Sequence, residues 1–378
     1  MPGSNPSENE KMLRGRKKTA TTLLRIVLGV LFVFSALVKL NDPMGLAFKI
    51  QEYLSLWASG LHLSPSLAID AAGTLITLEL ILGVVLLLGR FKVFALWTLL
   101  ALNGLFTLVT FYSAVTGAVP HCGCFGDALV LSPWVSFIKS LVTLALTVTL
   151  LLWQRFIKPS VGFRTSMSVV ALLFAFSIGM IYYVLRHEPP IDFRPYKVGT
   201  NLAQALSAPA DQDPTVSYNV WIYRVDGQEK QYRDSDEPWN IPGAEFVSRK
   251  TLRTGGIRPN NTADFMVFDS EGNQMTDSLL AMEHVLLVTC YDMEKSEAES
   301  WLALAELQKK EILPPMVVLA DTDPQTLRER FGITAPVYLA DPTLLKTLLR
   351  SNPGAVELRR GTITDKWSTA RIADLAQD

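Results

Sequence analysis

Five long apolar runs constrain the fold of this chain more than any other feature of its sequence. They occupy residues 23–40, 67–88, 93–117, 134–153 and 166–185. Each is about 20 residues long, the length at which an α-helix crosses the hydrocarbon core of a bilayer. The first run is too long for the apolar region of a signal peptide, and no small-residue cleavage pattern follows it, so we expect it to be retained. The sequence therefore predicts a five-span α-helical membrane half followed by a water-soluble half.

The formal net charge of −1 is the sum of a basic first half and an acidic second half. Residues 1–190 contain 15 Lys and Arg against 8 Asp and Glu, whereas residues 191–378 contain 20 against 28. Together with the apolar runs, this distribution excludes a single soluble enzyme, a nucleic-acid-binding protein and a disordered chain. We expect membrane lipid and other proteins as partners, and no nucleic acid.

Basic residues are concentrated in every second connection between the runs, which predicts the orientation of the spans. These connections contain Lys11, Arg14, Arg16, Lys17 and Lys18, then Arg90 and Lys92, then Arg155, Lys158 and Arg164. In the other connections, residues 41–66 contain only Lys49 and residues 118–133 contain no base. We expect a multi-pass protein of a cell inner membrane, with a cytoplasmic N-terminus and a periplasmic C-terminal half. Helical spacing over 45–61 predicts a short helix that lies in the membrane interface or caps the bundle.

The soluble half begins after a proline-rich boundary at residues 187–196. We expect a hairpin turning at Asp226-Gly227, and then alternating strands and helices, which are typical of α/β folds. The expected strands are 263–269, 285–290, 315–320, 336–340 and 355–359, and the expected helices are 296–310, 324–331 and 368–376. The predicted domains are a basic cytoplasmic arm (1–20), a four-helix membrane domain (21–158), a fifth membrane helix (166–186), a linker with the hairpin (187–260) and an α/β domain (261–378).

The strongest local motif lies in the base-free loop between the third and fourth runs, where Cys122 and Cys124 are separated only by Gly123. A disulfide across one residue is strained, and strained, exposed disulfides are the more readily exchanged. His121 could stabilise the thiolate, which is the reactive form of cysteine. Two other interpretations stay open: a static disulfide, and a metal site that would need His121, Asp127 or a partner protein.

Four ionisable residues lie within or at the ends of the predicted spans, where charge is costly and often functional. They are Lys39, Asp70, Glu79 and Lys139. They could line a pocket that is accessible to protons or to a quinone, or pair with each other to hold the bundle together. The two lysines could also extend to the membrane interface without any function.

The third cysteine, Cys290, ends an expected strand at the place where a thioredoxin-like fold carries its C-x-x-C pair. Met293 occupies the position of the second cysteine. Because one thiol cannot perform intramolecular dithiol exchange, we expect a buried, inactive cysteine. The segment Ile333-Thr334-Ala335-Pro336, directly before a strand, resembles the one that carries a cis-proline in such folds.

The sequence resembles the DoxX/MauE family of small membrane proteins over about residues 20–155. The resemblance rests on the first run through Tyr53, on Glu79 followed by Gly83, and on CGCFGD at residues 122–127. It implies a four-helix core linked to disulfide or redox maturation in the periplasm. Residues 261–378 are similar to TlpA-like thioredoxin folds but lack their cysteine pair, so oxidoreductase activity does not carry over to this part.

These observations lead to one functional expectation and one rival. We expect a thiol–disulfide oxidoreductase in which Cys122 and Cys124 exchange with a periplasmic protein, electrons can pass to a quinone, and the thioredoxin-like domain serves as a docking module. The rival is a non-catalytic envelope scaffold in which the cysteine pair is a static disulfide. A small-solute transporter is disfavoured, because five spans with few polar residues show no inverted repeat.

Overall fold

The computed structural model of this chain forms two compact units, residues 1–185 and 186–378. The structure describes residues 6–57, 63–117, 119, 123, 125–126, 128–129, 131–207, 216–225, 227–233, 236, 241–243, 245–254, 265–320 and 324–376.

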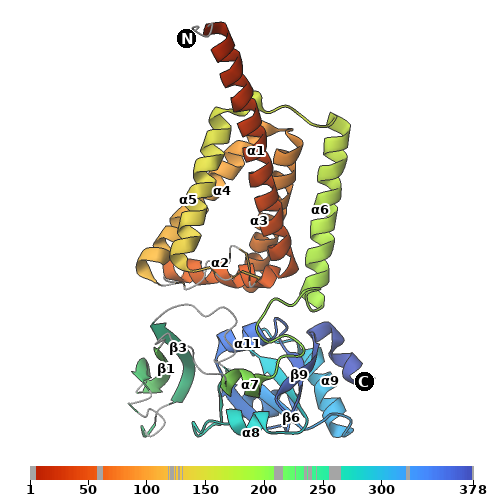
Figure 1. Ribbon diagram of the computed structural model, residues 1–378. Coiled ribbons are helices and arrows are strands. Elements are labelled where there is room, and N and C mark those ends of the chain that lie inside the picture. The colour runs from red at the N-terminus through yellow and green to blue at the C-terminus, as the bar shows by residue number, and fades with distance from the viewer. Residues whose placement is uncertain are drawn as a thin grey trace. The chain divides into compact units, whose positions relative to one another are not determined.

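The first unit is a helical bundle, shown in red to yellow-green in Figure 1. Its long helices are α1 (Pro6–Asn41), α3 (Pro65–Leu88), α4 (Lys92–Thr116), α5 (Pro133–Leu152) and α6 (Phe163–Arg186). Each of these five helices is long and apolar enough to cross a membrane, among the residues that the structure describes. The predicted five-span architecture is confirmed, and the chain is a multi-pass membrane protein.

Local sequence signals account for the ends of these helices. Ser64 and Ser132 cap α3 and α5 through their side chains, and a proline follows each of them. Gly89 and Gly117 end α3 and α4 with left-handed backbone at φ 67° and 65°. A further helix, α2 (Pro43–Trp57), crosses one end of the bundle at the position of the expected short helix, and a single 3₁₀ turn, η1 (Gln154–Phe156), follows α5.

Two glycines set the close approach of α1 and α3. A Cβ atom at Gly29 would lie 2.5 Å from Leu87 Cγ, and one at Gly83 would lie 3.0 Å from the backbone nitrogen of Val33. Apolar side chains from α1, α3, α4 and α5 then form the core of the bundle. Helix α6 is the least buried of the five spans and stands beside the others in Figure 1.

The second unit is built on a six-stranded sheet with the order β4-β7-β6-β5-β8-β9. Its strands are β4 (Val267–Phe268), β5 (Val285–Cys290), β6 (Met316–Ala320), β7 (Val337–Ala340), β8 (Gly354–Arg359) and β9 (Thr362–Trp367). Strand β6 is parallel to β5 and β7, whereas β8 is antiparallel to β5 and β9, and β4 is antiparallel to β7. The sheet is therefore mixed, with the fully buried β5 near its centre.

The side chains of β5 alternate between two apolar cores, one on each face of the sheet. Helices therefore cover both faces. One core receives α9 (Ala298–Lys309), α10 (Pro324–Phe331) and the 3₁₀ helix η5 (Thr369–Ala376). The other receives α7 (Leu202–Ser207), α8 (Thr276–Leu280) and α11 (Pro342–Leu348). This arrangement is consistent with a thioredoxin-like fold and confirms the predicted fold class.

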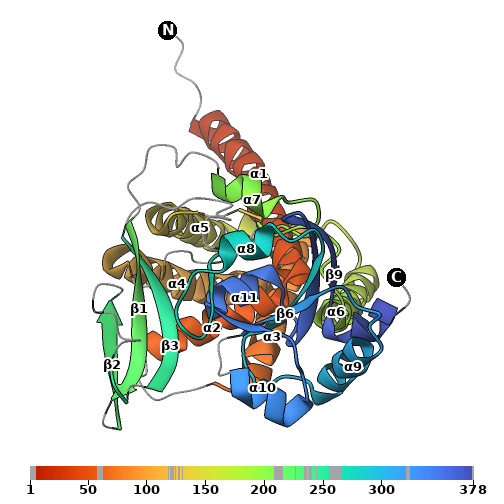
Figure 2. The ribbon, with the colours of Figure 1, turned by 90° about the horizontal axis from the view of Figure 1, so that it is seen from below.

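A separate antiparallel sheet in the second unit has the order β2-β1-β3 (Figure 2). Its strands are β1 (Val216–Val225), β2 (Gln228–Arg233) and β3 (Glu245–Thr254). Strands β1 and β2 form the expected hairpin, whereas β3 was not predicted. The Trp221 ring of β1 lies 5.8 Å from the Phe268 ring of β4, which joins the small sheet to the large one.

The segment that follows α6 is anchored to its own domain by buried charges. Arg194, only 3% exposed, binds Glu188 at 2.5 Å and Asp192 at 2.7 Å. Lys366 of β9 binds Asp192 at 2.9 Å. Burial alone would raise the pKa of Asp192, but the hydrogen bond and charge of Arg194, together with Lys366, outweigh it and lower that pKa to about 2.

Candidate functional site

A buried ion pair lies between α1 and α3. Lys39 Nζ is 2.5 Å from Glu79 Oε2, and the two residues are 4% and 3% exposed. The close packing of α1 and α3 at Gly29 and Gly83 brings these two side chains together. The Lys39 ammonium also lies 5.6 Å from the centre of the Phe106 ring of α4. The interior of the bundle therefore contains a fully desolvated pair of opposite charges.

A third charge, Lys139 of α5, joins this pair. It is half-buried and interacts electrostatically with both Lys39 and Glu79. Its ammonium lies 4.7 Å above the centre of the Phe125 ring. Asp70 does not belong to the cluster: it is exposed on α3, nine residues before Glu79, and nine residues turn an α-helix to its opposite face.

The predicted reactive residues Cys122, Cys124 and His121 lie outside the residues that the structure describes, as does Asp127. Gly123, Phe125 and Gly126 of the same loop are described. Gly123 and Gly126 have left-handed backbone at φ 67° and 53°, and Gly126 N–H donates to the Gly123 carbonyl at 3.0 Å. These glycines provide a backbone conformation that other residues rarely adopt.

The described residues of the loop pack against the bundle. The Phe125 side chain is 6% exposed, and its ring centre lies 6.0 Å from that of Phe34 on α1. A Cβ atom at Gly123 would lie 3.2 Å from Lys49 Cγ on α2. The two sequence neighbours of Cys124 therefore each lie beside a lysine: Gly123 beside Lys49, and Phe125 beside Lys139.

A row of buried polar side chains between α4 and α5 was missed by the sequence reasoning. Its members are Asn103, Thr107, Thr110 and Ser113 on α4, and Ser136, Ser140, Thr143 and Thr147 on α5. Asn103 Nδ2 donates to Thr147 Oγ1 at 2.9 Å, and the Ser113 hydroxyl lies 2.8 Å from the Tyr53 hydroxyl of α2. The repeating spacing of three and four residues was the available signal, since small polar residues commonly line membrane helix interfaces.

In the second unit, Cys290 ends β5 and is 1% exposed, and Met293 is also buried. Asn352 fixes the backbone after Cys290: its Oδ1 accepts from Tyr291 N–H at 3.2 Å, and its Nδ2 donates to the Asp292 carbonyl at 2.6 Å. Cys290 is thus a buried cysteine in a tightly held strand end, as the sequence led us to expect.

The bond before Pro336 is trans, the usual state of an X-Pro bond, although its segment resembles one that carries a cis-proline. Among the described residues, the cis peptide bond is Asn352-Pro353, directly before β8, and not the bond before Pro336. Pro336 precedes β7, which pairs with β6, whereas β8 is the antiparallel neighbour of β5, the strand that ends at Cys290. The proline beside that strand end is therefore Pro353.

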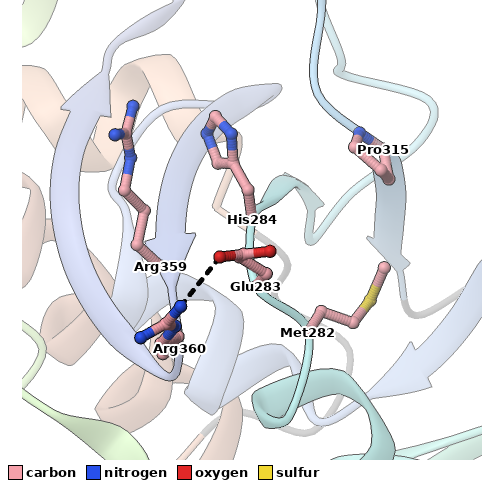
Figure 3. A pocket seen from close by; sticks show the side chains of 6 residues that line it. All are labelled: Met282, Glu283, His284, Pro315, Arg359 and Arg360. Carbon is pink, nitrogen blue, oxygen red and sulfur yellow. Dashed lines mark hydrogen bonds and ion pairs between the residues drawn. The ribbon is translucent and has the colours of Figure 1, made fainter.

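A hollow of about 780 Å³ lies at the opposite end of the sheet, where β5 and β6 begin (Figure 3). His284 Nε2 is 2.6 Å from Glu357 Oε1, and Arg360 binds Glu283 at 2.8 Å. The ion pair of Glu283 and Arg360 thus borders this hollow, and Met282 and Pro315 form its apolar side. No group of three or more His, Cys, Asp or Glu residues that could hold a metal ion occurs in the described parts of the chain.

Comparison with known proteins is consistent with the helical pattern of the first unit. Residues 17–154 match the model of a family described as methylamine utilisation protein MauE. Protein TlpB of Flavobacterium psychrophilum is 32% identical over 132 residues, which are 34% of this chain and 35% of that protein. The chain thus matches about a third of the length of this curated relative. The matched family region contains α2 to α5 and most of α1, and it ends before α6.

Proposed function

We propose that this MauE-like membrane protein exchanges thiols and disulfides with periplasmic proteins through Cys122 and Cys124. In this proposal the chain crosses the inner membrane five times from a cytoplasmic N-terminus. The distribution of Lys and Arg supports that orientation. The loop 118–133 and residues 186–378 then face an oxidising compartment, where a cysteine pair can cycle between dithiol and disulfide.

The observation that carries the proposal is the cluster of the buried Lys39 and Glu79 with the half-buried Lys139, beside the described residues of the cysteine loop. A purely structural ion pair needs two charges, and the interior holds a third at a high desolvation cost. This third charge lies over the ring of Phe125, the residue that follows Cys124. A net positive cluster beside a C-x-C loop favours the thiolate, the form in which cysteine attacks a disulfide.

The proposed exchange balances without a cofactor. A thiolate of the reduced pair attacks a client disulfide, forms a mixed disulfide and releases one client thiolate. The second cysteine then attacks this mixed disulfide, so that the client leaves as a dithiol with two more electrons and two more protons. The Cys122–Cys124 pair is left as a disulfide, and the reverse sequence oxidises a client dithiol.

In this proposal the second unit docks clients and performs no exchange of its own. Cys290 is buried, Met293 replaces the second cysteine, and Asn352 holds the adjoining backbone. A thioredoxin-like fold without a dithiol keeps its capacity to bind polypeptides but cannot complete an exchange.

Trapping of mixed disulfides tests the exchange. A Cys124→Ser variant lacks the resolving thiol, so Cys122 should accumulate reductant-sensitive adducts with envelope proteins, visible on non-reducing gels of the full chain. Cys290→Ser is the matched control and should leave trapping unchanged, because Cys290 is buried. A Cys122→Ser/Cys124→Ser double variant should form no adduct.

Absence of adducts from both single variants, Cys122→Ser and Cys124→Ser, together with full function of the double variant, would contradict the exchange. That result would favour the scaffold, in which the same loop is a static disulfide. Adducts that persist in the double variant and disappear with Cys290→Ser would place the reactive thiol in the second unit and would also contradict the proposal.

A further inference from the structure

Five basic residues come together at the end of the bundle opposite α2 (Figure 1). We call them the basic cluster: Arg25 of α1, Arg90 and Lys92 at the turn between α3 and α4, and Arg155 and Lys158 after α5. Lys92 Nζ donates to the carbonyls of Gln154 and Ile157 at 2.8 and 3.1 Å. Arg25 Nη1 donates to the Lys158 carbonyl at 2.9 Å, and a Cβ atom at Gly89 would collide with the same nitrogen. These contacts hold the turn, the chain after α5 and Arg25 in one region.

The carboxylates on the helices of the basic cluster lie far from it. Residues 11–41, 80–126 and 128–185 contain no Asp or Glu. The acidic residues of the first unit are Glu8, Glu10, Asp42, Glu52, Asp70, Glu79 and Asp127. On α1, Glu8 and Glu10 precede Arg25 by 15 residues or more, which is at least about 22 Å along the helix axis. On α3, Glu79 precedes the last residue, Leu88, by nine residues or about 14 Å, and it binds Lys39.

The other described acidic residues belong to the end of the bundle that α2 crosses. They are Asp42 directly before α2, Glu52 on α2 and Asp70 in the second turn of α3. Asp127 lies outside the described residues, but its neighbour Gly126 lies beside Val38, which follows Arg25 by 13 residues or about 20 Å on α1. The charge of the basic cluster is therefore uncompensated within the described part of the first unit.

Two buried nitrogens of the basic cluster, Arg25 Nε and Arg90 Nε, have no hydrogen-bond partner among the described residues. Arg25 as a whole is only 9% exposed. Its Nη1 and Nη2 donate to the Lys158 carbonyl and, at 3.3 Å, to the Ser160 hydroxyl, neutral acceptors that position the charge without balancing it. Buried donors are nearly always paired, and an unbalanced buried charge is costly. The cluster is therefore suited to an anionic acceptor.

Exposed aromatic rings adjoin the basic cluster. Phe91, between Arg90 and Lys92, is 39% exposed, and Phe163, directly before Arg164, is 55% exposed. The centres of these two rings lie 5.9 Å apart. Aromatic and basic residues occur together at the boundary between membrane and water, where a phospholipid carries its phosphate next to apolar chains. The combination fits a phospholipid better than a free phosphate ion.

We propose that the basic cluster binds the phosphate of an anionic phospholipid. Arg25 and Arg90 donate to the phosphate oxygens, which the planar fork of a guanidinium matches well. Pockets of basic residues between membrane helices bind lipid headgroups in this way. Basic residues also orient membrane helices during insertion, but that role requires charge and not the burial of Arg25. Lipid binding at this end of the bundle does not require thiol exchange in the cysteine loop.

Titration with a labelled lipid tests this site. The full chain, in micelles of an uncharged detergent at about 0.15 M salt, is titrated with phosphatidylglycerol that carries a fluorophore on one acyl chain, and the apparent Kd is measured. Arg90→Gln should raise that Kd about tenfold or more, because it removes a hydrogen bond between charged groups. Arg25→Gln should do the same. Arg90→Gln keeps the bonds of Arg25 and Lys92 to residues 154–158, so the comparison stands if Arg25→Gln fails to fold.

Arg14→Gln is the matched control, because it makes the same substitution at an exposed residue of α1. Arg14 precedes Arg25 by 11 residues, about 16 Å along the helix, which is about two Debye lengths at this salt concentration. The Kd of Arg14→Gln should therefore stay close to that of the wild type. Wild-type affinity in Arg90→Gln would overturn the proposal, as would an equal loss of affinity in Arg14→Gln.

Competition distinguishes a lipid headgroup from a free phosphate. Inorganic phosphate at millimolar concentration should not displace the labelled phosphatidylglycerol, because it lacks the apolar chains that lie beside Phe91 and Phe163. Phosphatidylcholine, whose headgroup has no net charge, should compete weakly. Full displacement by inorganic phosphate would identify an anion site without a lipid, and equal competition by phosphatidylcholine would identify a general lipid surface. Each of these two results would contradict a site for an anionic phospholipid.

Discussion

Glu79→Gln is expected to lower the unfolding free energy of the bundle by about 3–5 kcal/mol, the usual cost of removing one partner from a buried ion pair. The variant leaves Lys39 buried at 4% exposure without its carboxylate, and Lys139 loses a carboxylate with which it interacts electrostatically. Chemical denaturation of the full chain in detergent, followed by helical circular dichroism, measures the loss. This large effect follows from burial, because an exposed pair contributes far less.

Two variants control for this expectation. Glu52→Gln removes the partner of the more exposed Lys49, three residues apart on α2, and should cost less than about 1 kcal/mol. A Lys39→Met/Glu79→Leu double variant replaces the pair with apolar groups and should recover most of the stability. If Glu79→Gln were no less stable than Glu52→Gln, the expectation that the buried Lys39–Glu79 pair stabilises the bundle would be contradicted.

Arg194→Met is expected to produce a loss of similar size, about 3–5 kcal/mol, in the second unit. Arg194 is 3% exposed and binds both Glu188 and Asp192, so its removal takes the guanidinium from two carboxylates, of which Asp192 keeps its bond to Lys366. Residues 188–194 would lose the guanidinium that links Glu188 to Asp192, so the bond of Asp192 to Lys366 of β9 would lose its support. Hydrogen exchange of the full chain should therefore accelerate in that segment and in β9, and remain unchanged in α1 to α5.

The pH dependence of the unfolding free energy of the second unit provides a second test of the Arg194→Met expectation. Asp192 has its pKa lowered from 3.8 to about 2 in the folded state, so its contribution is complete above about pH 4 and is lost as the pH falls towards 2. That contribution is about 2 kcal/mol. Arg194→Met should weaken this acid-induced loss, whereas Arg360→Met, which removes an exposed partner of Glu283, should not. If the unfolding free energies of the wild type and Arg194→Met fell equally between pH 4 and pH 2, the claim that Arg194 stabilises the ionised Asp192 would be contradicted.

The membrane architecture was predictable because length and hydropathy determine which segments cross a bilayer. The α/β order of the second unit was predictable for a related reason: apolar period and turn residues are local signals. The position of the cis-proline was not predictable in this way, because it depends on which strand lies antiparallel to β5. That is a property of sheet topology, and Pro336 and Pro353 both precede strands.

In the candidate site, the charged residues could be identified from the sequence, but their partners could not. Lys39, Glu79 and Lys139 stood out because charge in an apolar run is conspicuous in any sequence. The ion pair itself depends on the packing of α1 against α3, which two glycines permit. The partner of Lys366 lies 174 residues away at Asp192, and such pairs cannot be inferred from spacing. The polar row between α4 and α5 could have been found from the matching intervals of its residues.

The redox state of the loop under controlled potential tests the central claim most directly. The full chain is equilibrated in dithiol–disulfide buffers over a range of potentials, and the thiols of Cys122 and Cys124 are alkylated and counted by mass spectrometry. If the pair exchanges, it should convert completely from two free thiols to one disulfide within the range of potentials of periplasmic redox proteins. Cys290 should stay protected throughout. A pair that keeps one state in every buffer, under both mild oxidant and mild reductant, would contradict the proposal.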